Sequence, residues 1–159
     1  MKTYIMYESK TGNTKMLADV IEETVRDTLV PTLEEAELVF LGSWTDKGNF
    51  VSTMIEKAKQ LKNKKVFIFG TCGFGVGEYQ DQLFHRAAAL LDDSNEVVGH
   101  YYCLGKMPAG ARKHFVAMLQ EHPDDKKLEV RIENFDRAAS HPNEEDLTKL
   151  RAELSKLAL

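Results

Sequence analysis

Apolar runs and helical patterns alternate along this chain, and the most apolar run limits the possible folds. Val66-Phe67-Ile68-Phe69 has no polar side chain at four consecutive positions. Because successive side chains of a strand point to opposite faces of its sheet, a strand with this sequence must be buried on both faces. Sheets covered on both faces are usually parallel and lie between layers of helices. The sequence therefore predicts a three-layer α/β/α fold around a parallel sheet.

The remaining apolar runs and periodic segments place the other elements. Strands are expected at residues 2–7, 37–42, 65–71 and 95–104. Helices are expected at residues 13–27, 50–61, 78–91 and 111–120, with a last helix that begins near Pro142. A short strand at residues 28–30 is either an edge strand or absent, because Pro31 follows it. Residues 122–125 are expected to form a turn and residues 130–139 a further short element.

Length and composition indicate one globular domain spanning residues 1–159. Hydrophobic residues make up 43% of the chain and charged residues 29%, which is ordinary for a soluble protein. No run approaches the ~20 apolar residues of a membrane span, and we expect a cytoplasmic protein that binds no membrane. The net charge of −4 argues against nucleic-acid binding through a basic patch. Cys72 and Cys103 lie far apart in the sequence, so we expect free thiols and no metal site.

The segment Ser9-Lys10-Thr11-Gly12-Asn13-Thr14 lies between the first expected strand and the first expected helix. The N–H groups of a first helical turn have no partner within the helix, and the helix dipole favours negative charge there. The serine and threonine hydroxyl groups add hydrogen-bond donors, and Gly12 allows the main chain to approach an anion closely. The sequence therefore predicts a phosphate-binding loop at this position.

Other phosphate-binding and catalytic motifs do not fit the chain. No Gly-Lys-Ser/Thr segment follows a spaced glycine, which argues against nucleotide hydrolysis of the P-loop type. The segment Gly73-Phe74-Gly75-Val76-Gly77 lacks the spacing of a dinucleotide fingerprint. The first strand does not end in a cluster of acids, as a phospho-accepting domain would require. The five histidines share no motif, and we predict no catalytic residue.

The loop at residues 9–14 has the pattern S/T-x-T-G-N-T, and with the α/β alternation it resembles the flavodoxin family. The resemblance extends to about Leu104 and includes the last helix. It implies a flavodoxin-like fold with a parallel sheet of four or five strands in the order 2-1-3-4-5, strand 2 being short or missing. Residues 44–48, 105–106 and 141–147 resemble a short subgroup, which we associate with accessory flavodoxins of bacterial bilirubin reductase.

The resemblance implies that FMN is the cofactor. The residues that would hold its phosphate through hydroxyl, side-chain amide and main-chain N–H groups are Ser9, Thr11, Asn13 and Thr14. Gly12 would let the phosphate approach the main chain. Lys10 would either add positive charge or point to solvent, and the solvent alternative is preferred.

The redox ring of FMN would lie at the carboxyl ends of the strands, between two loops. The residues expected there are Ser43, Trp44, Thr45, Gly48, Thr71, Cys72, Gly73, Phe74 and Tyr79. The single tryptophan would lie in a polar loop and either stack on the ring, disfavouring its doubly reduced anionic state, or cover local core. Gly48 would supply a flexible peptide or begin a helix. Residues 71–73 would offer main-chain groups, and Tyr79, in preference to Phe74, would cover the opposite face unless both are core.

Three functions remain open at this point. The leading one is an FMN-binding electron-transfer protein that exchanges electrons with a reductase and an acceptor enzyme, bilirubin reductase being one candidate partner. The first alternative is an FMN-dependent reductase that uses NAD(P)H and a quinone or tetrapyrrole acceptor. In that case residues 105–140 would form a wall over the flavin. The second alternative is a flavodoxin-like accessory subunit without bound flavin.

Overall fold

A central sheet organises the structure, a computed structural model that describes residues 1–159. Four strands lie parallel in the order β1-β2-β4-β5. Their bounds are Thr3–Glu8 for β1, Leu38–Asp46 for β2, Lys65–Cys72 for β4 and Glu96–Leu104 for β5. The short strand β3 (Asn49–Phe50) pairs antiparallel with the end of β2.

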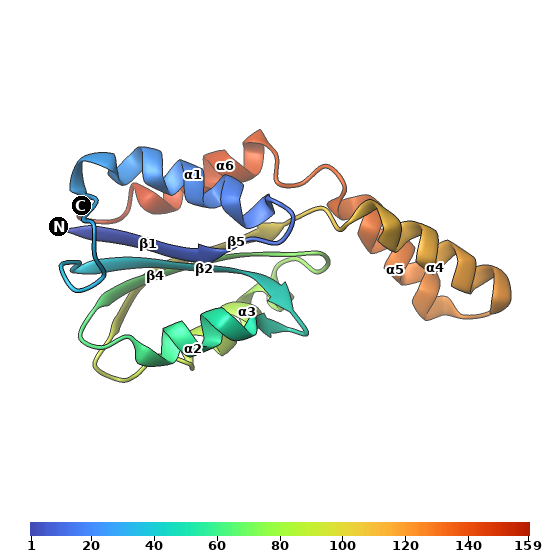
Figure 1. The fold of residues 1–159 in the computed structure, drawn as a ribbon. Coiled ribbons are helices and arrows are strands. Elements are labelled where there is room, and N and C mark those ends of the chain that lie inside the picture. The colour runs from blue at the N-terminus through green and yellow to red at the C-terminus, as the bar shows by residue number, and fades with distance from the viewer.

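Helices cover both faces of this sheet (Figure 1). One face carries α1 (Asn13–Val25) and α6 (Glu144–Leu154), and the other carries α2 (Ser52–Gln60) and α3 (Glu78–Ala88). The 3-10 turn η1 (Arg26–Thr28) continues α1. None of the helices combines the length and the apolar character needed to cross a membrane. The arrangement confirms the predicted three-layer α/β/α fold.

The short strand expected at residues 28–30 is reduced to a single bridge. Leu29 pairs in parallel with Thr3, and the Val30 N–H group donates a 2.9 Å hydrogen bond to the Thr3 carbonyl. Pro31 follows and has no N–H group to extend the pairing. The segment expected as the second strand of the 2-1-3-4-5 order, which is not the element labelled β2, therefore forms a single bridge beside β1. This confirms that the expected strand is short.

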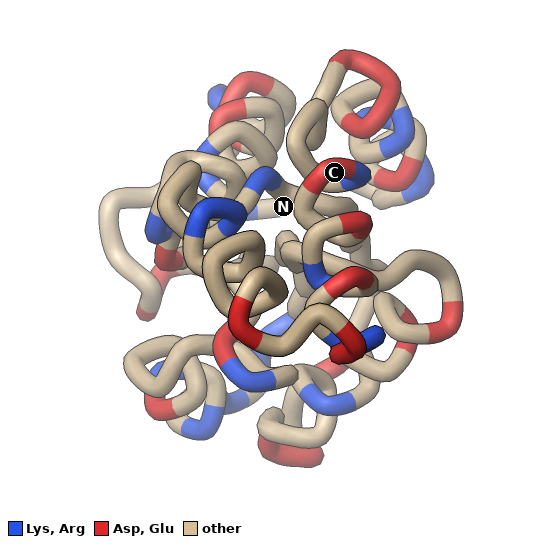
Figure 2. The backbone as a smooth tube through the Cα atoms, turned by 90° about the vertical axis from the view of Figure 1, so that its right-hand side faces the viewer, with Lys and Arg blue, Asp and Glu red and all other residues tan.

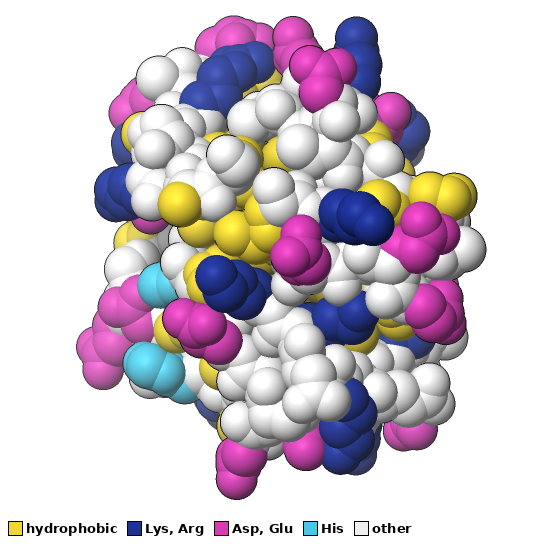
Figure 3. Space-filling model, turned by 90° about the vertical axis from the view of Figure 1, so that its left-hand side faces the viewer, with side chains coloured by type: hydrophobic (Ala, Val, Ile, Leu, Met, Phe, Trp, Pro, Cys, Tyr) yellow, Lys and Arg dark blue, Asp and Glu magenta, His cyan; other side chains and the backbone are white.

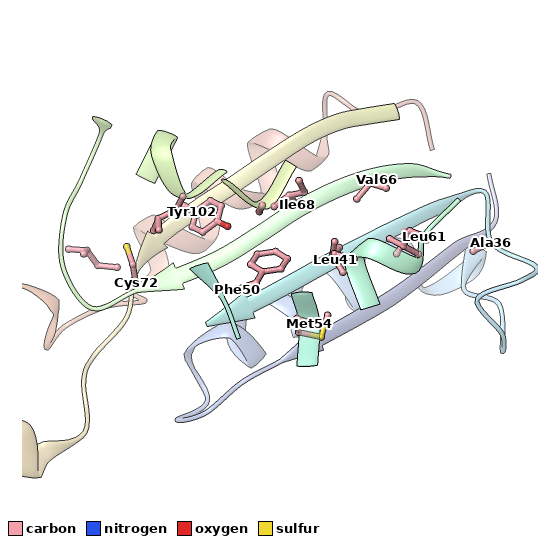
Figure 4. Close-up of a cluster of buried hydrophobic side chains, with 14 of the residues drawn as sticks. Ala36, Leu41, Phe50, Met54, Leu61, Val66, Ile68, Cys72 and Tyr102 are labelled. Atoms are coloured by element: carbon pink, nitrogen blue, oxygen red, sulfur yellow. The ribbon is translucent and has the colours of Figure 1, made fainter. Parts of the chain in front are cut away.

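Two hydrophobic clusters, one on each face of the sheet, hold the layers together. The side chains of β4 alternate between them: Val66 and Ile68 join the cluster with α2 and α3, whereas Phe67 and Phe69 join the cluster with α1 and α6. All four side chains are completely buried, which confirms the two-sided burial predicted from this run. Figure 4 shows the cluster on the side of α2 and α3. Burying each such side chain contributes about 1.5–3 kcal/mol.

The expectation that Trp44 lies in a polar loop is wrong, because β2 continues through it to Asp46. The chain reverses at Lys47 and Gly48, whose φ angles are 51° and 78°. Asp46 and Thr45 then pair with the two residues of β3. A two-residue turn with positive φ at both positions matches the twist of a β-hairpin. Trp44 is thus fixed on a strand rather than carried by a flexible segment.

Several helix boundaries also differ from expectation. α2 begins at Ser52 rather than at residue 50, and α3 ends at Ala88 rather than at residue 91. The short element expected at residues 130–139 is a full helix, α5 (Lys126–Ala138). Its N-terminus is capped by Asp125, whose carboxylate accepts a 2.9 Å hydrogen bond from the Lys127 N–H group. This cap starts the helix earlier than its apolar pattern indicated.

α4 (Ala109–Glu121) and α5 form an antiparallel hairpin that projects beyond the carboxyl ends of the strands (Figure 1). Arg112 of α4 and Asp136 of α5 form two side-chain hydrogen bonds of 2.8 and 3.2 Å. The hairpin leaves and rejoins the body of the molecule at neighbouring points, because the Lys106 N–H group donates a 2.9 Å hydrogen bond to the His141 carbonyl. Most of residues 105–140 therefore project outward and do not form the wall that the reductase alternative requires.

Candidate functional site

A hollow of about 160 Å³ lies at the carboxyl ends of the parallel strands. Its lining comes from the loop after β1, the ends of β2 and β4, and the loop after β5. The lining residues are Lys10, Thr11, Asn13, Trp44, Thr45, Thr71, Cys72, Gly73, Gly105, Lys106, Met107 and Pro108. The first eight of these are residues predicted from the sequence. Ligands of open parallel sheets bind at this edge, so we take this hollow, called the pocket below, as the candidate site.

The loop between β1 and α1 brings unused hydrogen-bond donors to the pocket. The main-chain N–H groups of Lys10, Thr11, Asn13 and Thr14 donate no hydrogen bond within the protein. The N-cap residue of α1 is Gly12, which has no side chain to cap these groups. Free N–H groups at the positive end of a helix dipole attract and hydrogen-bond an anion. The loop therefore has the properties of an anion-binding site.

Ser9 and Gly12 give this loop its shape. Gly12 adopts φ 91°, in the left-handed region that glycine enters without steric cost. The Ser9 Oγ atom accepts hydrogen bonds from the N–H groups of Gly12 and Lys15, both at 3.2 Å. Neither Ser9 nor Gly12 lines the pocket itself. The structure thus places these two predicted residues where they organise the loop.

Asn13 joins the two sides of the pocket. Its Nδ2 atom donates hydrogen bonds to the Lys106 carbonyl (2.8 Å) and to Thr11 Oγ1 (3.1 Å). Because the carbonyl can only accept, the amide nitrogen must face it, and this fixes the orientation of the side chain. Asn13 is 7% exposed, and its buried Oδ1 atom has no hydrogen-bond partner. A buried acceptor without a partner is costly, so this side chain is held in place by its two donated hydrogen bonds at the expense of its oxygen.

Three threonines connect the elements beneath the pocket. The Thr14 and Thr71 hydroxyl groups share a 2.9 Å hydrogen bond, and the Thr45 hydroxyl donates to the Thr71 carbonyl at 2.8 Å. Thr14 and Thr71 are buried. These bonds join α1, β4 and β2 and hold the floor of the pocket. The side chains of Thr14 and Thr71 are thus engaged with each other, and Thr14 lies behind the pocket lining.

Trp44 and Lys10 meet at the pocket. The Lys10 Nζ atom lies 5.0 Å from the centre of the indole ring, a distance that permits a cation–π interaction. Lys10 is exposed to solvent, as preferred from the sequence, and it also borders the pocket over the Trp44 ring. Lys10 and Lys106 are the only charged residues that line the pocket. Its electrostatic character is positive, in agreement with the free N–H groups.

Ser43 and Gly48 do not line the pocket. Ser43 is buried, and its hydroxyl donates to the Trp44 carbonyl (2.6 Å) and accepts from the Val51 N–H group (3.0 Å). The Gly48 carbonyl accepts a 2.9 Å hydrogen bond from Arg86 in α3. These contacts fix the position of the hairpin that carries Trp44.

Phe74 and Tyr79 also lie outside the pocket lining. Their rings stack on each other with centroids 4.8 Å apart and an interplanar angle of 25°. Burial raises the pKa of the Tyr79 hydroxyl and raises the pKa of the neighbouring Cys72 thiol to about 12. Both groups therefore stay neutral at physiological pH. Trp44 is the one predicted aromatic residue that the structure brings to the pocket.

Four lining residues were not predicted from the sequence: Gly105, Lys106, Met107 and Pro108. They follow β5, and the rule that ligand sites form at the carboxyl ends of parallel strands could have identified them. Met107 packs on Gly73, where an added Cβ atom would lie 2.8 Å from the Met107 Cγ atom. Gly105 packs on Asn13 in the same way, because a Cβ atom added at Gly105 would lie 2.7 Å from the Asn13 Nδ2 atom.

A larger hollow of about 790 Å³ lies at the opposite end of the sheet, on the side of the molecule that faces the viewer in Figure 3. It includes Met1 and Leu159 at the two ends of the chain, and its polar lining carries both signs of charge, with Glu37, Lys64 and Lys65 among its residues. It lies at the amino ends of the strands, where open parallel sheets do not place their ligands. The pocket at the carboxyl ends remains the better candidate.

The sequence matches the flavodoxin domain family over residues 4–155, and the chain belongs to the flavodoxin family. Within that family it is 31% identical to the flavodoxin-like domain-containing protein BilS of Clostridioides difficile (strain CD3), over 92% of this chain and 90% of that protein. It is 28% identical to a flavodoxin of Megasphaera elsdenii, over 67% and 88% of the two chains. The crystal structure of oxidised flavodoxin 2 from Bacillus cereus shares the fold, with 18% identity, a TM-score of 0.53 and coverage of 99% of this chain and all of the other.

Proposed function

We propose that this protein binds FMN and transfers electrons between redox proteins. The observation that carries the proposal is the set of four free N–H groups in the loop after β1 and the first turn of α1, beside a pocket whose only charged residues are lysines. A phosphate dianion requires such donors and such charge. Membership of the flavodoxin family supports FMN as the molecule that bears this phosphate.

The residues of the pocket fit FMN in three groups. The N–H groups of residues 10, 11, 13 and 14 and the Thr11 hydroxyl would hold the phosphate. Trp44 would contact the flat ring, and main-chain groups of residues 71–73 would meet its polar edge. When bound, FMN supplies one- and two-electron redox chemistry. The protein's part is to bind the cofactor, orient it and limit the access of water to the ring.

The size of the pocket supports an electron carrier over a reductase with its own substrate site. Pockets for drug-sized ligands typically have volumes of about 300–1,000 Å³, whereas this pocket has about 160 Å³. A flavin nucleotide would therefore protrude, and its ring edge would stay accessible to a partner protein. The outward projection of α4 and α5 agrees with an open site (Figure 1). The free N–H groups argue against an accessory subunit without flavin.

For the acceptor we propose an enzyme of the bilirubin reductase type. The support is the resemblance of residues 44–48, 105–106 and 141–147 to accessory flavodoxins of that system. The similarity to BilS over nearly the whole chain agrees with this subgroup. The partner reductase that supplies electrons would be a separate protein.

The test is a titration of the purified protein with FMN and with riboflavin, followed by flavin absorbance and fluorescence. We expect a yellow complex with FMN and much weaker binding of riboflavin, which lacks the phosphate. A well-folded protein that stays colourless and binds no added FMN would contradict the proposal. Steady-state oxidation of NAD(P)H by the protein alone would indicate the reductase alternative, whereas a carrier would need a partner reductase.

A further inference from the structure

The end of the molecule that carries the pocket also carries its most exposed large hydrophobic side chains. Phe74, Val76 and Val130 are exposed to 48, 57 and 51%, and no other large hydrophobic residue exceeds 42%. Phe74 and Val76 belong to the loop between β4 and α3, and Val130 belongs to α5. Phe74 and Val130 line one open hollow of about 480 Å³ between this loop and the hairpin. Exposed apolar side chains that cluster beside a site mark an interaction surface.

Positive charge surrounds this apolar centre. The other residues that line the hollow are Lys126, Lys127, Arg131 and Asn134. Residues 127, 130, 131 and 134 follow helical spacing and share one face of α5. None of the three cations forms an ion pair with a carboxylate, and no carboxylate lines the hollow. Arg131 lies over the Phe115 ring, 5.8 Å from its centroid, and all three cations can form ion pairs with the carboxylates of a partner.

We propose that this surface binds an electron-exchange partner protein whose contact surface has an apolar centre bordered by carboxylates. The surface, called the docking patch, is formed by Phe74, Val130, Lys126, Lys127 and Arg131. The chain as a whole has a net charge of −4, whereas the hollow is lined by three cations and no carboxylate, so this surface attracts the acidic groups of a partner. Figure 2 shows the charged residues as seen from the side of the hairpin.

The docking patch adjoins the pocket. Gly73 lines the pocket, and the next residue, Phe74, lines the docking patch. A protein seated on the docking patch would therefore lie beside the exposed edge of the proposed flavin. The inference rests on the proposed function in this respect. Beyond that function, the α4–α5 hairpin would select the partner protein by the charge of its contact surface.

Two other occupants fit less well. Nucleic acid is disfavoured because Asp and Glu outnumber Lys and Arg in the chain, 25 to 21, and such an excess repels a polyanion. A second copy of this chain would have to place either its own docking patch, which is also cationic, or another of its faces against the docking patch. The experiment below distinguishes self-association from binding of a redox partner.

The test compares electron transfer from the FMN-loaded protein to two probe proteins of opposite charge, acidic rubredoxin and basic cytochrome c. The protein is reduced with dithionite and mixed with each acceptor in a stopped-flow instrument at low and high salt. In the triple variant Lys126→Glu, Lys127→Glu, Arg131→Glu, we expect the second-order rate constant with rubredoxin to fall at least about tenfold at low salt. The rate constant with cytochrome c should rise, and both effects should shrink at high salt. Phe74→Ser with Val130→Ser should lower the rubredoxin rate at either salt concentration.

The matched control is the triple variant Arg26→Glu, Lys57→Glu, Lys59→Glu, which changes the net charge equally at exposed positions outside the docking patch. It should alter the rubredoxin rate much less. Flavin absorbance is recorded first for every variant. If the variants bind FMN but the patch variant reduces rubredoxin no more slowly than the control, the docking patch is refuted and the carrier function stands.

Two further outcomes are decisive. An unaltered chain that binds no FMN would refute the proposed function and this inference with it. If sedimentation shows that the unaltered chain is a dimer and that the patch variant is a monomer, the docking patch is a self-association surface and the assignment to a redox partner is wrong.

Discussion

The Asn13 side chain donates a 2.8 Å hydrogen bond to the Lys106 carbonyl across 93 positions of the sequence. The bond joins the anion-binding loop after β1 to the loop after β5, so two walls of the pocket hold each other in place. The same side chain keeps a buried acceptor atom without a partner inside the protein. Asn13 would therefore link binding of the proposed FMN to the shape of the pocket.

Replacing Asn13 tests this link. Asn13→Ala removes both hydrogen bonds of the amide, and we expect the dissociation constant for FMN to rise at least about tenfold, with a loss of about 1 kcal/mol in the free energy of unfolding. Asn13→Asp should weaken FMN binding further, because a carboxylate cannot donate to the Lys106 carbonyl and repels a phosphate. Fluorescence titration and urea unfolding measure the two effects. Asn49→Ala, at an exposed position, is the control, and equal FMN affinities in all four proteins would contradict the role of Asn13.

Gly105 is expected to be intolerant of even one added carbon atom. A Cβ atom there would lie 2.7–2.9 Å from three atoms of the Asn13 side chain, so Gly105→Ala must displace Asn13 and should weaken FMN binding. Gly110→Ala is a matched control in α4, where nothing lies within 4 Å of the added atom. The control should leave binding unchanged and stabilise the helix by up to about 1 kcal/mol. The prediction fails if both alanine variants bind FMN as the unaltered chain does.

Trp44 and Thr11 should affect different properties of the bound flavin. Trp44→Ala removes the flat ring that lines the pocket, so we expect weaker FMN binding together with a shift of the flavin potentials, because water gains access to the ring. Thr11→Ala removes a hydroxyl group near the phosphate and should weaken binding with a smaller redox effect. Spectroelectrochemical titration of each variant measures the potentials. Equal shifts in the two variants would contradict the separate roles.

The buried thiols predict a loss of stability at alkaline pH. Burial raises the pKa of Cys72 from 9.0 to about 12 and also raises the pKa of Cys103. Because the folded-state pKa exceeds the unfolded value, the contribution of the neutral thiol is complete below about pH 9 and is lost as the pH rises toward 12. We expect the free energy of unfolding in urea to fall more steeply above pH 9 in the unaltered chain than in Cys72→Ala. Identical slopes would show that the thiol is not protected in the folded state.

The fold could be predicted well because its decisive signals are local. Residues 66–69 are apolar at every position, and only a strand buried on both faces accommodates such a run. The loop at residues 9–14 likewise combines its glycine, its hydroxyl groups and its position before a helix within six residues. Both features depend on neighbours in the sequence, so pattern and propensity were sufficient to identify them.

The errors concern features that depend on distant contacts or on the local backbone. Trp44 looked like a loop residue because polar residues follow it, but the turn at Lys47 and Gly48 allows β2 to continue and pair with β3. The lining by Met107 and Pro108 arises only when the ends of β4 and β5 come together. Charged residues between the apolar residues of α5 also hid the length of that helix. The lining of the pocket in particular depends on contacts between segments that are far apart in the sequence.

The main-chain bond between Lys106 and His141 has a consequence for how such proteins can diversify. The hairpin leaves and rejoins the body of the molecule at neighbouring points. During evolution α4 and α5 can therefore change in length or charge, or be replaced, without disturbing the strands or the anion-binding loop. The surface that the hairpin presents to other molecules and the pocket beside it can then be selected independently in the same small protein.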